Sequence, residues 1–279
     1  MSLFSHILIL IKGAGDLGTG VAWRLHKAGF AVVIVELAQP LVVRRTVAFA
    51  NAVYDGAITV EGVVARCVDS FGQARALLDA GIIPVLVDPD GRAAKELLPR
   101  VLVDAVMAKH NTGTRLDQAE FIIALGPGFT PGVDCHAVIE TSRGHNLGRV
   151  WWHRASEPNT GVPGEIGGKS GDRVLRAPRA GVMIGVAQIG DRVARGQVIA
   201  RVDDAAVIAP FDGMLRGLVH DGLIVQAGMK IGDIDPRANR DACFTISDKS
   251  LAIGGGAVEA VLTWMNEKQN LELRVQSSD

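Results

Sequence analysis

Apolar runs alternate with segments of helical character over the first 150 residues of the chain. The pattern predicts strands at 7–11, 31–35, 62–68, 83–87, 101–108 and 121–125, and helices at 19–28, 71–80 and 93–98. The strands are apolar throughout, which is typical of a parallel sheet covered by helices on both faces. This order predicts an α/β domain over residues 1–150 with a Rossmann-like, doubly wound parallel sheet.

A glycine motif directly follows the first apolar run and leads into the first predicted helix. It contains Gly13, Gly15, Asp16 and Gly18, and Glu36 ends the next apolar run. Glycines in this setting allow a tight turn and a close approach of the backbone to a phosphate, and the helix N-terminus attracts the anion. A carboxylate at Glu36 would hold a ribose diol and repel a 2′-phosphate, which favours NAD-like or adenosine ligands. The alternative is a glycine-rich turn that binds no ligand.

Two later strands are also followed by polar or glycine-rich loops. Lys109, Asn111 and Thr114 come after the strand at 101–108, and Gly126 and Gly128 come after the strand at 121–125. Because ligands bind beyond the carboxyl ends of parallel strands, we expect both loops to face the same crevice as the glycine motif.

Two charged groups complete the candidate ligand site. Arg44 and Arg45 suit a phosphate or another oxyanion, although adjacent charges are also typical of a solvated helix face. Glu140, Arg143 and His145 lie close together and could hold an anionic group or take part in acid–base chemistry. They could equally form a salt-bridge network that braces the connection between two domains.

From Arg176 onward the chain repeats itself with an offset of 32 residues. Ala177-Pro178 recurs as Ala209-Pro210, and the same offset relates several later glycine and aliphatic positions. The repeat predicts a β barrel-sandwich module over 176–236, which resembles biotinyl/lipoyl domains. Carrier domains of that type bear a modified lysine on the hairpin that joins the halves, but no lysine occurs between Lys169 and Lys230. We therefore expect no covalent biotin or lipoate.

The remaining parts of the chain are a predicted linker at 151–175 and a C-terminal segment at 237–279. The C-terminal segment contains three consecutive glycines, Gly254 to Gly256, before an apolar helix at 257–265. We expect a glycine-rich turn there. It could be a second phosphate loop, or a turn that lets the helix pack against the first domain.

Composition and charge exclude several classes of function. A net charge of −1 gives no electrostatic footprint for nucleic acid, and no apolar run reaches the roughly 20 residues of a membrane helix. Cys67, Cys135 and Cys243 are far apart and fit a reducing cytoplasm, and no secretory signal is apparent. No zinc-binding spacing, Walker A motif or nucleophile elbow is present, so we expect no metal site and assign no catalytic residue.

Taken together, the motifs resemble those of the YqeB family over nearly the whole chain. The resemblance rests on residues 11–17, 44–49, 53–56, 60–62, 108–114, 126–129, 140–149, 159–164, 231–236 and 243–256. It implies a cytoplasmic accessory or maturation protein for a selenium-dependent molybdenum hydroxylase, which would be its client. XdhC-type accessory proteins, which also carry a Rossmann-like domain, are more distantly similar.

Three functions therefore remain open from the sequence. The first is a maturation factor that binds a nucleotide or dinucleotide non-covalently, either NAD-like or a molybdopterin dinucleotide, and docks its client through the β module. The second is an NAD-dependent oxidoreductase, for which only His145 or Lys109 could serve as acid or base. The third is a non-catalytic scaffold, and a homo-oligomer is compatible with each.

Overall fold

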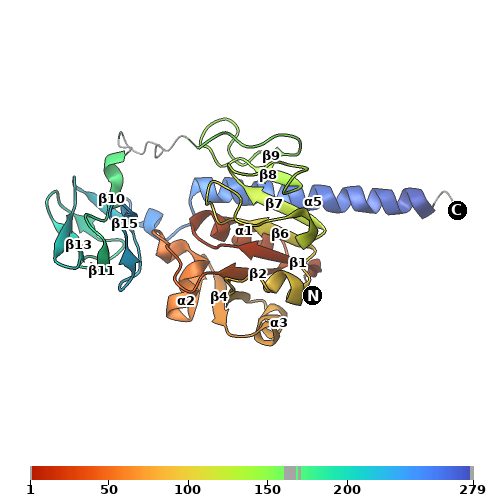
Figure 1. The fold of residues 1–279 in the computed structure, drawn as a ribbon, viewed down its shortest axis with the longest axis horizontal. Coiled ribbons are helices and arrows are strands. Elements are labelled where there is room, and N and C mark those ends of the chain that lie inside the picture. Colours follow the sequence, from red (N-terminus) through yellow and green to blue (C-terminus); the bar gives the residue numbers. More distant parts are fainter. Residues whose placement is uncertain (1, 160–167, 169–170, 277–279) are drawn as a thin grey trace.

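The computed structural model describes residues 2–159, 168 and 171–276, with side chains described as far as residue 271. It contains one nine-stranded sheet and two four-stranded sheets within these residues. Figure 1 shows an α/β region that carries the large sheet, with a smaller all-β module at one side. The predicted linker at 151–175 lies between them in the sequence, although residue 151 ends a strand of the large sheet and residues 171–175 belong to a 3-10 turn and the first strand of the module. Residues 160–167 and 169–170 lie outside the described part, as does most of the 159–164 motif.

The large sheet has the order β3-β4-β5-β2-β1-β6-β7-β8-β9. Its strands are β1 (Phe4–Lys12), β2 (Phe30–Glu36), β3 (Ala57–Val60), β4 (Val63–Val68), β5 (Ile83–Val87), β6 (Val101–Asp104), β7 (Phe121–Leu125), β8 (Ala137–Ile139) and β9 (Val150–Trp151). Only the edge pairs β3·β4 and β8·β9 are antiparallel. The predicted parallel arrangement is therefore confirmed for the centre of the sheet.

Helices cover both faces of this sheet, which explains why its strands are apolar at every position. Ile9 and Ile11 pack towards α1 (Asp16–Lys27) and α5 (Asp248–Gln276), whereas Leu10 packs on the opposite face with α3 (Phe71–Asp79) and α4 (Ala93–Leu97). The shorter helices are α2 (Ala52–Asp55) and the 3-10 turns η1 (Arg45–Val47), η2 (Phe49–Asn51), η3 (Leu116–Gln118), η4 (Gly171–Arg173) and η5 (Asp241–Cys243). None of the described helices meets the length and hydropathy that a membrane span requires.

The predicted glycine-rich turn near the C-terminus is wrong. Gly254, Gly255 and Gly256 lie inside α5, which runs along α1 and projects beyond the sheet (Figure 1). A Cβ atom on Gly254 would overlap the carbonyl oxygen of Gly20 in α1, and one on Gly256 would overlap that of Gly148. The glycines therefore let α5 approach its neighbours closely, and this packing outweighs their low helix propensity.

The β module reproduces the repeat that the sequence predicts. Its strands are β10 (Val174–Arg176), β11 (Gly181–Gly185), β12 (Arg192–Val193), β13 (Val198–Val202), β14 (Ala205–Ile208), β15 (Gly213–Leu218), β16 (Ile224–Val225) and β17 (Lys230–Asp235). They form antiparallel sheets of order β10-β17-β15-β12 and β14-β13-β11-β16. The offset of 32 residues pairs β10 with β14, β11 with β15, β12 with β16 and β13 with β17. Exchanging the two strands of each pair converts one strand order into the other, so the two halves are related by a pseudo-twofold symmetry.

The module also contacts the α/β region directly. The Nε of Arg45 donates to the carbonyl oxygen of Leu218 at 3.1 Å, and the Oγ1 of Thr46 donates to that of Cys243 at 2.6 Å. Gly217 of β15 lies against the backbone of Val43. The chain then returns from β17 through η5 to α5, so three segments distant in sequence meet at this junction.

Candidate functional site

The glycine loop lies between β1 and α1, at the carboxyl edge of the sheet. Gly13 has a φ of +83°, and a Cβ atom on Gly18 would overlap the carbonyl oxygen of Gly13. Gly15 is the N-cap of α1, and no atom lies within 4 Å of the position that its Cβ would occupy. Gly13 and Gly18 thus shape the turn, while the space beside Gly15 stays open.

Glu36, at the end of β2, reaches back to this loop. Its carboxylate accepts hydrogen bonds from the backbone N–H of Ala14 at 2.6 Å and from that of Leu37 at 3.1 Å. Burial raises the pKa of Glu36, although both hydrogen bonds oppose this shift. The structure therefore brings the predicted acid and the glycine loop together, and the acid orders the loop through one of its N–H groups.

The loops after β1, β6 and β7 lie side by side at this edge. A Cβ atom on Gly13 would lie 3.2 Å from the Cα of Val106, and one on Gly128 would lie 2.7 Å from the carbonyl carbon of Lys109. Lys109 itself is exposed and has a φ of +67°. The predicted convergence of these loops on one edge is therefore present in the structure.

Asn111 and Thr114 have structural roles in the loop after β6. The Oδ1 of Asn111 accepts hydrogen bonds from the N–H of Gly113 at 2.9 Å and of Thr114 at 2.7 Å, and its amide donates to the carbonyl oxygen of Thr114 at 2.8 Å. These bonds close a turn and leave the Asn111 side chain occupied.

Thr114 forms a polar trio with Lys12, which is half-buried, and with Asp104, which is buried; the sequence analysis assigned neither of these two partners to the site. The Nζ of Lys12 donates to the Oγ1 of Thr114 at 2.7 Å, and that hydroxyl donates to Asp104 at 2.5 Å. Lys12 also forms an ion pair with Asp104 at 3.3 Å. Lys12 ends β1 and Asp104 ends β6, and these two strands are neighbours in the sheet. Because the ends of neighbouring parallel strands lie together, the charged residue at the end of each apolar strand was the signal that could have predicted this ion pair.

The two predicted arginines point in different directions. Arg44 is buried, and its Nη1 lies 3.0 Å from both carboxylate oxygens of Asp16. Its Nη2 donates to the carbonyl oxygens of Ala242 and Thr245, each at 2.9 Å. The interpretation of Arg44 as part of a solvated helix face is therefore wrong. Arg44 instead connects Asp16, at the end of the glycine loop, with the segment before α5. Arg45 instead contacts the β module.

Glu140 and Arg143 form contacts with nearby parts of the α/β region. Glu140 is fully buried, and its carboxylate accepts hydrogen bonds from the N–H of Ser142 at 2.7 Å and of Glu157 at 2.8 Å. Arg143 pairs with Asp248 at 2.8 and 3.0 Å, which holds the pKa of Asp248 well below its usual range. His145 is exposed. These contacts fix the 140–157 loop and attach it to the start of α5.

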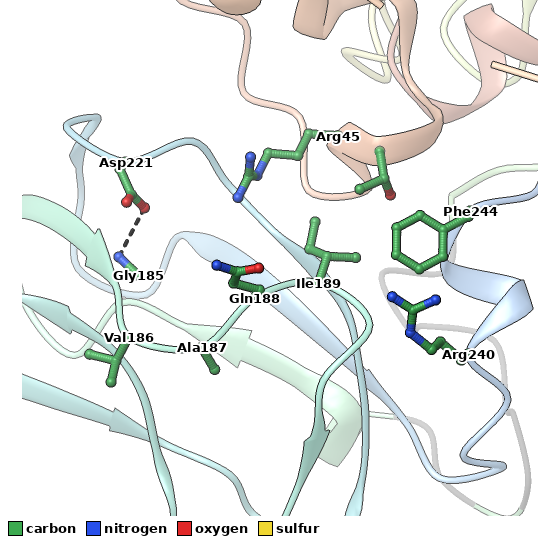
Figure 2. A pocket seen from close by; sticks show the side chains of 10 residues that line it. Arg45, Gly185, Val186, Ala187, Gln188, Ile189, Asp221, Arg240 and Phe244 are labelled. Carbon is green, nitrogen blue, oxygen red and sulfur yellow. Dashed lines mark hydrogen bonds between the residues drawn. The ribbon is translucent and has the colours of Figure 1, made fainter. Parts of the chain in front are cut away.

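The described part of the chain has pockets away from the glycine loop, and two of them are considered below. The larger, about 550 Å³, lies where the module meets the α/β region (Figure 2). Figure 2 shows Arg45 from η1, Gln188 from the loop after β11, and the stacked pair of Arg240 and Phe244 around it. The second, about 330 Å³, lies beside α5 and β1. The glycine loop lines neither pocket.

The cysteines and potential metal ligands form no reactive cluster in the described residues. Burial raises the pKa of Cys67, Cys135 and Cys243, which keeps these thiols protonated at neutral pH. No group of three or more His, Cys, Asp or Glu side chains is placed to hold a metal ion within the described part of the chain.

Comparison with known proteins gives one close relative. No family model matches the chain. The chain is 52% identical over 262 residues to the Escherichia coli (strain K12) protein named "Uncharacterized protein YqeB", and the match covers 94% of this chain and 48% of that protein. The chain is a close homologue of YqeB. It spans about half the length of that relative.

Similarity to solved structures is weak. An aspartoacylase family protein from Mesorhizobium loti shares 13% identity and a TM-score of 0.27, covering 84% of this chain and 86% of that one. The product-bound ectoine utilization protein EutE (DoeB) from Ruegeria pomeroyi shares 13% identity and a TM-score of 0.25, covering 82% and 84%. Scores this low support no argument about function.

Proposed function

We propose that the chain binds a nucleotide or dinucleotide non-covalently over the glycine loop and acts as an accessory protein. The observation that carries this proposal is the space beside Gly15, at the N-terminus of α1, with Glu36 at the end of the neighbouring strand. A helix N-terminus offers free N–H groups and a positive dipole end to a phosphate. The strand order β5-β2-β1-β6-β7 around this loop is the order of a Rossmann-like sheet.

The client is proposed to be a molybdenum hydroxylase, including its selenium-dependent forms. This part of the proposal rests on the resemblance of the motifs to the YqeB family, and the ligand would then be NAD-like or a molybdopterin dinucleotide. The β module, with its biotinyl/lipoyl-like repeat and no lysine on the joining hairpin, would dock the client and carry no covalent cofactor. Such a protein would act in the cytoplasm.

The oxidoreductase alternative has less structural support. Its two candidates for an acid or base, His145 and Lys109, are both exposed. A general acid or base works best with a pKa tuned by burial or by a fixed neighbour. The Lys12–Thr114–Asp104 trio is held together by hydrogen bonds and an ion pair, so it offers no clear replacement.

A thermal-shift series tests the ligand. Wild-type protein is mixed with NAD, ATP, CTP or a molybdopterin dinucleotide, and a ligand at 100 times its Kd should stabilise the fold by about 2.7 kcal/mol. Gly15→Val should abolish that shift while keeping the melting temperature of the free protein, because the added side chain enters open space. Gly72→Val is the matched control, since Gly72 lies in the first turn of α3 and the position of its Cβ has only the Oγ of Ser70 nearby, at 4.0 Å.

Two results would contradict the ligand proposal. One is a melting temperature that none of these ligands raises, and the other is an equal ligand shift in wild type and Gly15→Val. The client is tested separately, by affinity purification from the native host followed by molybdenum and selenium analysis of the eluted proteins. Recovery of no molybdenum hydroxylase would argue against the client assignment.

A further inference from the structure

Arg45 suits an oxyanion by its sequence setting, yet the proposed function does not use it. Its Nε donates to the carbonyl oxygen of Leu218 in the β module at 3.1 Å, and its side chain forms no other hydrogen bond or ion pair with a described residue. This bond fixes the guanidinium and leaves both of its Nη groups as free donors. Arg45 lines the larger pocket, of about 550 Å³, and Figure 2 shows its guanidinium directed towards the module.

Arg240 places a second guanidinium in the wall of the same pocket. Arg240 is the N-cap residue of η5, and its Cζ lies 4.8 Å from the centroid of the Phe244 ring. Its guanidinium forms no hydrogen bond or ion pair with a described residue. Stacking on the ring occupies one face of the guanidinium, but the N–H groups lie in its plane and stay available. The larger pocket therefore has two cations with unused donors.

Carboxylates near the larger pocket leave both guanidinium groups unpaired. Asp221 is the one carboxylate among the described residues that line the pocket, and its Oδ1 accepts a backbone N–H of β11 at 2.9 Å. Asp191 accepts a backbone N–H in the loop after β11 at 2.8 Å, and Asp241 follows Arg240 in the sequence. Neither of these two carboxylates forms an ion pair with Arg45 or Arg240. The lining thus carries two positive charges and one negative charge.

Apolar surface lies between and beside these charged groups. Phe244 is 37% exposed, and in Figure 2 Ile189 lies between the two guanidinium groups. Gly190 has a φ of +95°, and a Cβ atom on it would lie 2.9 Å from two ring carbons of Phe244. The ring therefore fits against the module because this position is glycine. A volume of this size, with apolar walls and a few polar groups, is typical of a site for a small molecule.

We propose that the larger pocket binds a small organic dicarboxylate, with one carboxylate on Arg45, the other on Arg240, and the carbon skeleton against Ile189 and Phe244. A guanidinium binds a carboxylate through two parallel hydrogen bonds, so two separated guanidinium groups favour a ligand with two separated carboxylates. Two phosphate groups would bring up to four negative charges to a lining that already contains Asp221, whereas two carboxylates bring only two. The glycine loop does not line this pocket, so the site is independent of the proposed function.

Titration calorimetry with two matched pairs of anions tests the site. Adipate and terephthalate carry two carboxylates, whereas hexanoate and benzoate carry one on the same carbon skeleton. In at least one pair, wild type should bind the dicarboxylate at least about tenfold more tightly than the monocarboxylate. Arg240→Met should reduce this preference to under about threefold, while the melting temperature stays within about 2 °C because the side chain is exposed. Arg195→Met is the matched control and should keep the preference, since Arg195 is exposed in the loop after β12 and does not line the pocket.

The outcomes separate this inference from the proposed function. If neither dicarboxylate binds, or if Arg240→Met keeps the wild-type preference, the inference is overturned. Gly15→Val should leave the dicarboxylate affinity unchanged, because Gly15 does not line the larger pocket. If the preference depends on Arg240 while no nucleotide raises the melting temperature, the inference stands and the nucleotide assignment fails. If nucleotides bind and depend on Gly15 while no dicarboxylate is preferred, the proposed function stands and the inference fails.

Discussion

Two adjacent glycines in α5 provide a matched test of how closely this helix packs against α1. Gly254 faces α1, whereas Gly255 has no atom within 4 Å of the position of a Cβ atom. Both have ordinary helical backbone, so alanine should improve helix propensity equally at the two positions, by about 0.8–1 kcal/mol. Any difference between Gly254→Ala and Gly255→Ala therefore measures the interhelical contact.

The expected size of that difference follows from the distances. A Cβ atom on Gly254 would lie 2.9 Å from the carbonyl carbon of Gly20 and 2.8 Å from the Cγ of Arg24, and it would overlap the carbonyl oxygen of Gly20. The Arg24 side chain can move, but the Gly20 backbone cannot move without separating the helices. Overpacking of this kind costs about 1–3 kcal/mol. Because backbone atoms are involved, we expect Gly254→Ala to destabilise the fold by about 1–2 kcal/mol net, and Gly255→Ala to stabilise it by about 0.5–1 kcal/mol.

Urea unfolding followed by tryptophan fluorescence is a suitable assay. All four tryptophans, Trp23, Trp151, Trp152 and Trp264, lie in the α/β region or on α5, so the signal reports the part of the molecule that contains the contact. In thermal unfolding each kcal/mol corresponds to about 2–4 °C for a chain of this size. Equal stability of the two variants, or a Gly254→Ala protein as stable as wild type, would refute the close packing of α1 and α5.

Two further predictions concern surface ion pairs. Hydrogen bonds from Arg100 and Lys268 lower the pKa of Glu120 to about 2, so this carboxylate stabilises the fold above its unfolded pKa of about 4.3, and the contribution is lost as the pH falls towards 2. Because these pairs are exposed, Glu120→Gln should lower the free energy of unfolding by under about 1 kcal/mol above pH 5 and leave it unchanged at pH 2. Urea titrations at both pH values measure this difference, and an equal loss of stability at the two pH values would contradict the assignment. Arg143→Met removes the ion pair with Asp248 and should lower the melting temperature by about 1–3 °C while ligand affinity changes less than twofold. Loss of affinity at an unchanged melting temperature would place Arg143 in ligand contact instead.

Much of the fold is predictable from the sequence because its elements are locally consistent. The apolar runs become the central strands within a few residues of their predicted ends, since burial on both faces requires apolar side chains at every position. The repeat predicts a two-fold β module because identical turn and core positions recur at one fixed offset. The triple glycine is the exception. Its local propensity predicts a break, and only the approach of Gly20 and Gly148 explains the continuous helix.

The candidate site is less predictable, because its contacts join distant parts of the chain. The meeting of the glycine loop with Glu36 and with the loops after β6 and β7 follows from strand order alone. The partners of Arg44 do not follow from strand order, since Ala242 and Thr245 reach it only after the chain has passed through the whole β module. A pattern of charges along the sequence cannot show which arginine will be buried against a returning segment.

The junction also explains why the motifs that carry the YqeB resemblance are spread along the chain. The motifs at 11–17, 44–49 and 243–256 are far apart in sequence, yet the structure brings them together. Arg44 contacts Asp16, the Oγ1 of Thr46 donates to the carbonyl oxygen of Cys243, and Ser250 contacts Asp16. These contacts join the glycine loop to the loop after β2 and to the start of α5, so residues of the separate motifs pack against one another in the fold.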